Sequence, residues 1–220
     1  IGILTDLLAQ HARKLQTIEF DPNLIPHLKD LLQKYPNTEL LHADALHTAL
    51  PHEPYKVIAN IPYYITSPLL NHFLQPKKTG ELRPKLLGLL VQKEVAEKVC
   101  AKDGDHSILS LQVQIFGHPQ IVMKVGKNSF YPAPKVDSAI IKIAVYDAPL
   151  IADTATFFKL ISAAFSQKRK TLLNSFQNNL KLEKSAATTL LEQAEISPME
   201  RPQRLSIEQW GSLCEGFIKS

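Results

Sequence analysis

The chain has 220 residues, 45% of them hydrophobic, which is enough to bury a core and too apolar for a disordered chain. A net charge of +4 and a pI of about 8.9 are compatible with a nucleic-acid partner without indicating one. Cys100 and Cys214 are far apart and have no metal-ligand spacing, which disfavours a disulfide scaffold or zinc site and favours the cytoplasm. No apolar run reaches the roughly 18 to 20 residues of a membrane span.

The first 146 residues alternate short apolar runs with helical stretches. This alternation predicts an α/β fold with a largely parallel sheet, and the closely spaced late strands predict an antiparallel edge. The expected strands are 16–20, 39–42, 56–60, 85–91, 121–124 and 139–146. One helix is expected from a cap at Asn23 to about Lys34, with Pro26 in its first turn, and another over 91–99. For 109–116 the periodicity does not separate a strand from a buried helix.

The composition changes near Asp147-Ala148-Pro149, after which no strong strand pattern follows. Helices are expected over 156–167, 170–180, 183–194 and 207–219. Ser206 and Gln209 have the spacing of a capping box at the start of the last helix. We therefore expect one α/β domain over 1–149 and a small all-helical domain over 150–220.

Two acidic residues lie at the ends of consecutive predicted strands, so both should reach the carboxyl edge of the sheet, where open α/β sheets bind ligands. Glu19 can accept hydrogen bonds from two ribose hydroxyls, and Asp44 can accept one from the exocyclic amine of an adenine. The backbone N–H of Ala45 can then serve a ring nitrogen. The alternatives are a surface carboxylate for Glu19 and a helix N-cap for Asp44.

The most specific pattern is Asn60-Ile61-Pro62-Tyr63, which follows an apolar strand. The exocyclic amine of adenine is a poor nucleophile because its lone pair is delocalised into the ring. The Asn60 side-chain oxygen and the Ile61 carbonyl can accept hydrogen bonds from the two N–H groups of this amine and favour its nucleophilic form. Pro62 fixes the loop, and Tyr63 offers a face for an extracted base. The alternative is an Asn-x-Pro turn with ordinary aromatic packing.

These residues resemble a known family, the small-subunit ribosomal RNA adenine dimethylases. Asn60-Ile-Pro-Tyr-Tyr-Ile-Thr-Ser-Pro68 is similar to the family's Asn-Leu-Pro-Tyr-Asn-Ile-Ser-Ser/Thr-Pro signature. Further segments resemble the family in matching order, together spanning residues 1 to about 213: Val91–Val99, Phe130–Ser138, Ala164–Leu172 and Arg201–Trp210.

The resemblance implies a Rossmann-like methyltransferase sheet, a helical RNA-binding domain and S-adenosylmethionine as cofactor. Glu19 would bind the cofactor ribose, Asp44 and Ala45 its adenine, and Gly2 would be the last glycine of its loop. Asn60, also close to the cofactor, and Tyr63 would handle the target adenine, while Phe130 would stack on its other face. A proline-flanked aromatic such as Phe130 also occurs in simple loop packing.

Two features depart from the family's pattern. The chain opens Ile-Gly-Ile without an initiator Met, and the family's first strand, earlier loop glycines and Gln-x-Phe-Leu segment have no counterpart. We expect that the chain is cut within a domain and that, without these parts, it does not bind S-adenosylmethionine appreciably. Residues 103–109 replace a segment in which the family usually has Pro-Gly and Tyr-Gly pairs, which affects the loop shape rather than the chemistry.

The resemblance implies transfer of methyl groups to N6 of adenines in small-subunit ribosomal RNA during ribosome biogenesis. The partner would be that RNA or the assembling small subunit, and the protein would be a monomer away from membranes. The resemblance also implies that Lys168, Arg169 and Lys170 contact the RNA phosphates, although such a run is more often a solvated helix face. The alternatives are a large-subunit methylase of the macrolide-resistance type, a DNA adenine methylase, and a non-catalytic assembly or transcription factor.

Overall fold

The computed structural model describes residues 2–76, 78–167 and 169–219. The chain divides into two compact units, one made of Ile1–Glu53 with Gln75–Arg83 and the other of Pro54–Leu74 with Pro84–Ser220. The domain boundary expected near residue 149 falls inside the second unit and stays a prediction. Each unit is described separately.

The first unit is built from two helix–strand pairs: α1 (Ile3–His11), β1 (Leu15–Glu19), α2 (Ile25–Leu32) and β2 (Thr38–His42). Strands β1 and β2 are parallel, with Glu19 opposite His42. Pro26 lies in the first turn of α2 as expected, but the cap expected at Asn23 is wrong. The Asn23 side chain instead donates to Asp21 Oδ1 at 2.9 Å, and Leu24 takes the N-cap position without a side-chain hydrogen bond.

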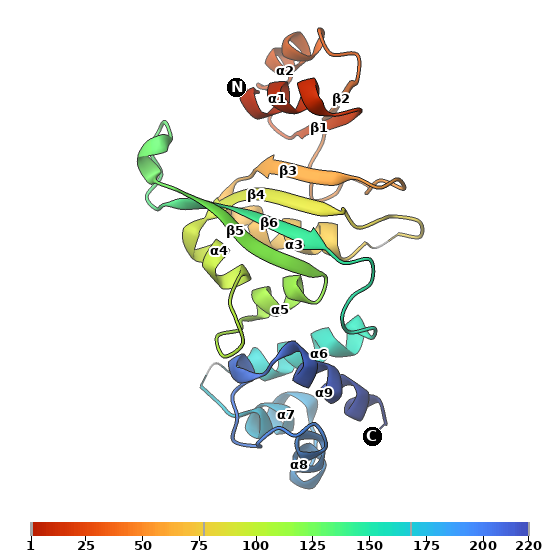
Figure 1. Cartoon of the computed structure of the whole chain (residues 1–220). Helices are drawn as coiled ribbons and strands as arrows, with labels where there is room; N and C mark the ends of the chain where they lie inside the picture. The colour runs from red at the N-terminus through yellow and green to blue at the C-terminus, as the bar shows by residue number, and fades with distance from the viewer. Residues whose placement is uncertain (1, 77, 168, 220) are drawn as a thin grey trace. The chain divides into compact units, whose positions relative to one another are not determined.

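The second unit contains a four-stranded sheet in the order β3-β4-β6-β5 (Figure 1). The strands are β3 (Lys56–Asn60), β4 (Leu86–Gln92), β5 (Gly117–Val125) and β6 (Ser138–Val145). Only β3 and β4 are parallel, whereas β6 is antiparallel to both β4 and β5. The α/β class and the antiparallel edge are confirmed, but this sheet is mixed rather than largely parallel.

One face of this sheet is buried by α4 (Lys93–Val99) and α5 (Ile108–Gln114), and the side chains of Leu87, Leu89, Ile141 and Ile143 form its core (Figure 1). The ambiguous segment 109–116 is mostly helical because Ser107 begins a reciprocal capping box. Ser110 N donates to Ser107 Oγ at 3.1 Å, and Ser107 N donates to Ser110 Oγ at 2.7 Å.

Helices α1 and α3 (Thr66–Leu74) were not expected from the sequence. Helix α3 follows directly from the short 3-10 turn η1 (Tyr63–Ile65), so the proline-containing signature hides its start. Its apolar residues Leu69, Leu70, Phe73 and Leu74 are buried, which makes α3 a structural support for the segment that follows β3.

The C-terminal part of the second unit is helical, as expected: α6 (Thr154–Phe165), α7 (Leu172–Leu180), α8 (Lys184–Gln193) and α9 (Ile207–Lys219). Trp210 is fully buried between Phe157 and Phe165, with ring centroids 6.4 and 6.3 Å away. The capping box at α9 is confirmed, since Gln209 N donates to Ser206 Oγ and Ser206 N to Gln209 Oε1. Among the described residues, no helix is long and apolar enough to cross a membrane.

Lys181 ends α7 in the left-handed region, with φ of 59° and ψ of 29°. A side chain with a Cβ is disfavoured there, and glycine is the usual residue at this position of a helix end. We expect Lys181→Gly to raise the free energy of unfolding by about 0.5–1 kcal/mol, because the relieved backbone strain exceeds the added chain entropy. Urea denaturation is the measurement. Lys184→Gly, at the start of α8, is the control and should destabilise; a destabilised Lys181→Gly would contradict this account.

Candidate active site

Glu19 ends β1 with its carboxylate folded back onto its own backbone. Its Oε1 accepts hydrogen bonds from the N–H groups of Phe20 and Asp21, both at 2.8 Å. Two backbone donors fix one oxygen, and the second oxygen keeps its acceptor capacity. Glu19 is therefore a carboxylate with a set direction at the carboxyl end of a parallel strand.

Asp44 follows β2 at the same edge of the β1–β2 pair, as expected: Ala43 N donates to Glu19 O at 3.0 Å. Asp44 does not cap a helix. Its Oδ1 accepts from Leu46 N at 2.8 Å, and its Oδ2 is 2.9 Å from His47 Nδ1, so it shapes a tight turn. Within the described part of the chain, nothing accepts a hydrogen bond from the N–H of Ala45, which is available to a ligand.

Gly2 is at the N-cap of α1 with φ of 75°, in the left-handed region. The positive φ favours glycine, and a Cβ at this position would be 2.6 Å from Leu31 Cδ2, so the Leu31 side chain would have to move. The start of α1 therefore combines an unusual backbone conformation with close packing in the first unit.

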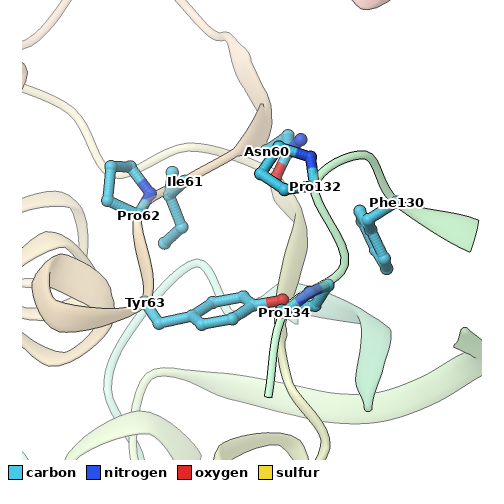
Figure 2. Close-up of a pocket in the computed structure, with 7 residues that line it drawn as sticks. All are labelled: Asn60, Ile61, Pro62, Tyr63, Phe130, Pro132 and Pro134. Atoms are coloured by element: carbon cyan, nitrogen blue, oxygen red, sulfur yellow. The ribbon is translucent and has the colours of Figure 1, made fainter. Parts of the chain in front are cut away.

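The second unit contains an open pocket of about 360 Å³. Its walls come from two segments, the exit of β3 and the loop between β5 and β6; the lining residues are Asn60, Ile61, Pro62, Tyr63, Phe130, Pro132 and Pro134 (Figure 2). The volume lies in the usual range for small-ligand sites. The seven lining residues include no carboxylate, histidine or lysine, so the lining is more apolar than polar, and its polar side chains are those of Asn60 and Tyr63.

Asn60 is the polar group of this pocket with the most hydrogen-bonding capacity. It is the last residue of β3, and no described residue forms a hydrogen bond with its side-chain amide. Ile61, next in the chain, is only 8% exposed, and its burial anchors the segment that carries Asn60. The amide is therefore held at the pocket by a rigid backbone and remains free to bind an incoming group.

Tyr63 crosses from the β3 side toward the facing loop (Figure 2). Its hydroxyl oxygen lies 2.6 Å from Oγ of Ser138, the first residue of β6. The facing loop is also fixed at its base. Asp137 Oδ1 accepts from Lys127 N at 3.0 Å, and Asp137 O accepts from Lys93 N at 3.0 Å. These bonds set the position of Phe130, which is half-buried in the loop.

The structure thus brings Asn60, Tyr63 and Phe130 together in one pocket and places Glu19, Asp44 and Ala45 at the strand edge of the other unit. Ser138, Pro132 and Pro134 had no role predicted from the sequence. The proline spacing indicates a shaped loop, but no sequence pattern reveals the contact between Tyr63 and Ser138. Among the described residues there is no group of histidine, cysteine or acidic side chains able to hold a metal ion.

The basic run expected on a helix is placed differently. Arg169 and Lys170 are exposed in the connection that precedes α7, because Thr171 caps that helix by accepting from Asn174 N. Lys168 lies outside the described residues.

The chain matches the family model described as ribosomal RNA adenine dimethylase over residues 1–219. It is 40% identical to ribosomal RNA small subunit methyltransferase A of Dehalococcoides mccartyi strain 195, over 97% of this chain and 75% of that protein. It is 38% identical to the protein of that name from Alkaliphilus oremlandii, over 100% of this chain and 79% of the relative.

Two solved structures share the fold. A dimethyladenosine transferase from Plasmodium falciparum superposes with a TM-score of 0.84 at 30% identity, over 99% of this chain and 86% of that one. The 23S rRNA methyltransferase ErmE superposes with a TM-score of 0.75 at 28% identity, over 98% and 86%. The fold is that of an α/β methyltransferase with a mixed sheet and C-terminal helices. The chain belongs to the ribosomal RNA adenine dimethylase family.

The hydrogen bond from Lys127 N to Asp137 Oδ1 joins the two ends of the pocket loop. We expect Asp137→Ala to lower the hydrogen-exchange protection of the Lys127 amide about two- to tenfold, since one hydrogen bond contributes about 0.5–1.5 kcal/mol. Asp137→Asn keeps an acceptor oxygen and should retain most of the protection. Core amides of β4 serve as the internal reference. Equal protection in the alanine variant and the parent would show that Asp137 does not fix the loop.

Proposed function

We propose that this protein transfers methyl groups from S-adenosylmethionine to N6 of adenines in small-subunit ribosomal RNA, forming dimethyladenosine during ribosome biogenesis. Its partner is that RNA or the assembling small subunit, and it acts as a monomer in the cytoplasm. Family membership and identity to curated small-subunit methyltransferases over nearly the whole chain support the reaction. The observation that carries it is the free Asn60 amide at the mouth of an aromatic, proline-lined pocket.

The pocket residues act on the target base by position. The Asn60 side-chain oxygen and the Ile61 carbonyl accept hydrogen bonds from the two N–H groups of the amine and so increase the nucleophilic character of its nitrogen. Tyr63 and Phe130, on opposite walls, hold the base by its faces after it leaves the RNA stack. No pocket residue is a general base, so the released proton passes to solvent. Catalysis rests on orientation and acceptor placement.

The first unit offers a donor and acceptor set that fits the cofactor. The free oxygen of Glu19 suits a ribose diol, and the Ala45 N–H suits an adenine ring nitrogen beside the Asp44 carboxylate. Gly2 permits a close backbone approach. When bound, S-adenosylmethionine supplies the electrophilic methyl group.

A large-subunit methylase is the closest alternative. It is favoured by the resemblance to the 23S rRNA methyltransferase, but that identity is 28%, against 40% for the small-subunit relatives. Methylation assays with small-subunit particles, large-subunit RNA and adenine-containing DNA separate the candidates. A non-catalytic factor would methylate none of these substrates.

We predict that Asn60→Ala in the full-length protein lowers the single-turnover methylation rate about 10²–10³-fold, because one well-placed acceptor is lost from the transition state. Its exposed position at the strand end should leave the stability close to that of the parent. Asn128→Ala, an exposed asparagine in η2 (Lys127–Ser129), is the matched control. A rate within threefold of the parent would refute the assignment of Asn60.

RNA binding is assigned to Lys168, Arg169 and Lys170, of which Arg169 and Lys170 are exposed in the structure. We predict that the double variant Arg169→Glu, Lys170→Glu weakens binding to small-subunit RNA. It should reduce the slope of log K against log salt by about one per lost phosphate contact. Cofactor affinity should not change. Lys29→Glu, an exposed reversal on α2, is the control. An unchanged slope would mean that the run is only a solvated surface.

A further inference from the structure

The two walls of the target pocket are joined by a hydrogen bond that the sequence motifs do not explain. The Tyr63 hydroxyl oxygen lies 2.6 Å from Ser138 Oγ, between residues 75 positions apart in the sequence. Ser138 is fully buried, and it pairs with Gln92 of β4 on one side and Val125 of β5 on the other. Tyr63 lies in the short turn η1, outside the sheet. Ser138 is therefore held in place by the sheet, whereas Tyr63 is not held by strand pairing.

The sheet explains how these residues meet. Asn60 pairs with Leu90 of β4, and Leu90 pairs with Ile140 of β6. Because β3 runs parallel to β4 and β6 runs antiparallel to it, the end of β3 and the start of β6 share one edge. Tyr63 lies just after the end of β3, and Ser138 is the first residue of β6.

Either hydroxyl can be the donor in this contact, and in both directions the bond joins the same two oxygens. Tyr63 is the one hydrogen-bond partner that the Ser138 side chain has among the described residues. Because Ser138 is fully buried, loss of this bond would leave its hydroxyl without a partner, which is costly.

We infer that Ser138 is a positioning residue for the methylation of the target adenine. Its hydrogen bond fixes the ring of Tyr63 at one angle, so that the ring offers a constant face to the base opposite Phe130. Without that bond the ring turns about its side-chain torsions and the base loses its aligned position. This inference rests on the proposed function, because it assumes a base in the pocket.

The test is a double-mutant cycle in the full-length protein with small-subunit RNA. We expect Ser138→Ala and Tyr63→Phe each to lower kcat about ten- to hundredfold, with KM for RNA changed less than threefold, since misalignment acts on the chemical step. The double variant should be no slower than either single variant, because both remove the same bond. Ser175→Ala is the matched control: Ser175 is also fully buried, but its hydroxyl has no hydrogen-bond partner in the described part of the chain.

A spectroscopic measurement separates positioning from general destabilisation. RNA with 2-aminopurine at the target position should be quenched in the parent complex, where the base stacks on Tyr63, and brighter with Ser138→Ala. Additive losses in the cycle, a Ser138→Ala rate equal to that of the parent, or unchanged fluorescence would each overturn the inference. A parent that does not methylate small-subunit RNA would instead overturn the proposed function, so the two failures are distinguishable.

Discussion

Strand β4 sets the geometry on which the target pocket depends. It pairs with β3 in parallel and with β6 in antiparallel orientation, and its own residues Leu87, Leu89 and Val91 are fully buried. A shift of one residue in either pairing would turn every side chain of the neighbouring strand to the opposite face. The burial of β4 therefore fixes where Asn60 ends one strand and where Ser138 begins another.

The chemistry of the pocket follows from its lack of charge. Tyrosine, phenylalanine and prolines surround a single free amide, a lining that suits the flat neutral ring and exocyclic amine of the proposed target base. An ionised side chain there would need a partner of its own and would compete with the base. The acidic residues that suit a sugar or a purine edge lie instead in the first unit, where Glu19 ends β1 and Asp44 follows β2.

The sequence predicted the elements whose patterns are local. Strand 56–60 and helix 207–219 have the expected bounds, because an apolar run and a capping box each mark their own ends. Helix α3 was missed because its start lies inside a proline-containing signature. The antiparallel edge was expected, but its share of the second unit's sheet was underestimated, because strand direction depends on pairing between distant segments. Local motifs indicated Asn60, Tyr63 and Phe130 as site residues. The contact between Tyr63 and Ser138 joins distant segments, so no local pattern indicated it.

The tie between Asp137 and Lys127 also bears on how this site can change during evolution. It closes residues 128–136 into a loop whose two ends are held together independently of its tip. Insertions, deletions and substitutions within the tip are therefore insulated from the pairing of β5 with β6. Changes at exposed tip positions such as Tyr131 can therefore adjust the surface beside the pocket, while the strands that carry Asn60 and Ser138 keep their register.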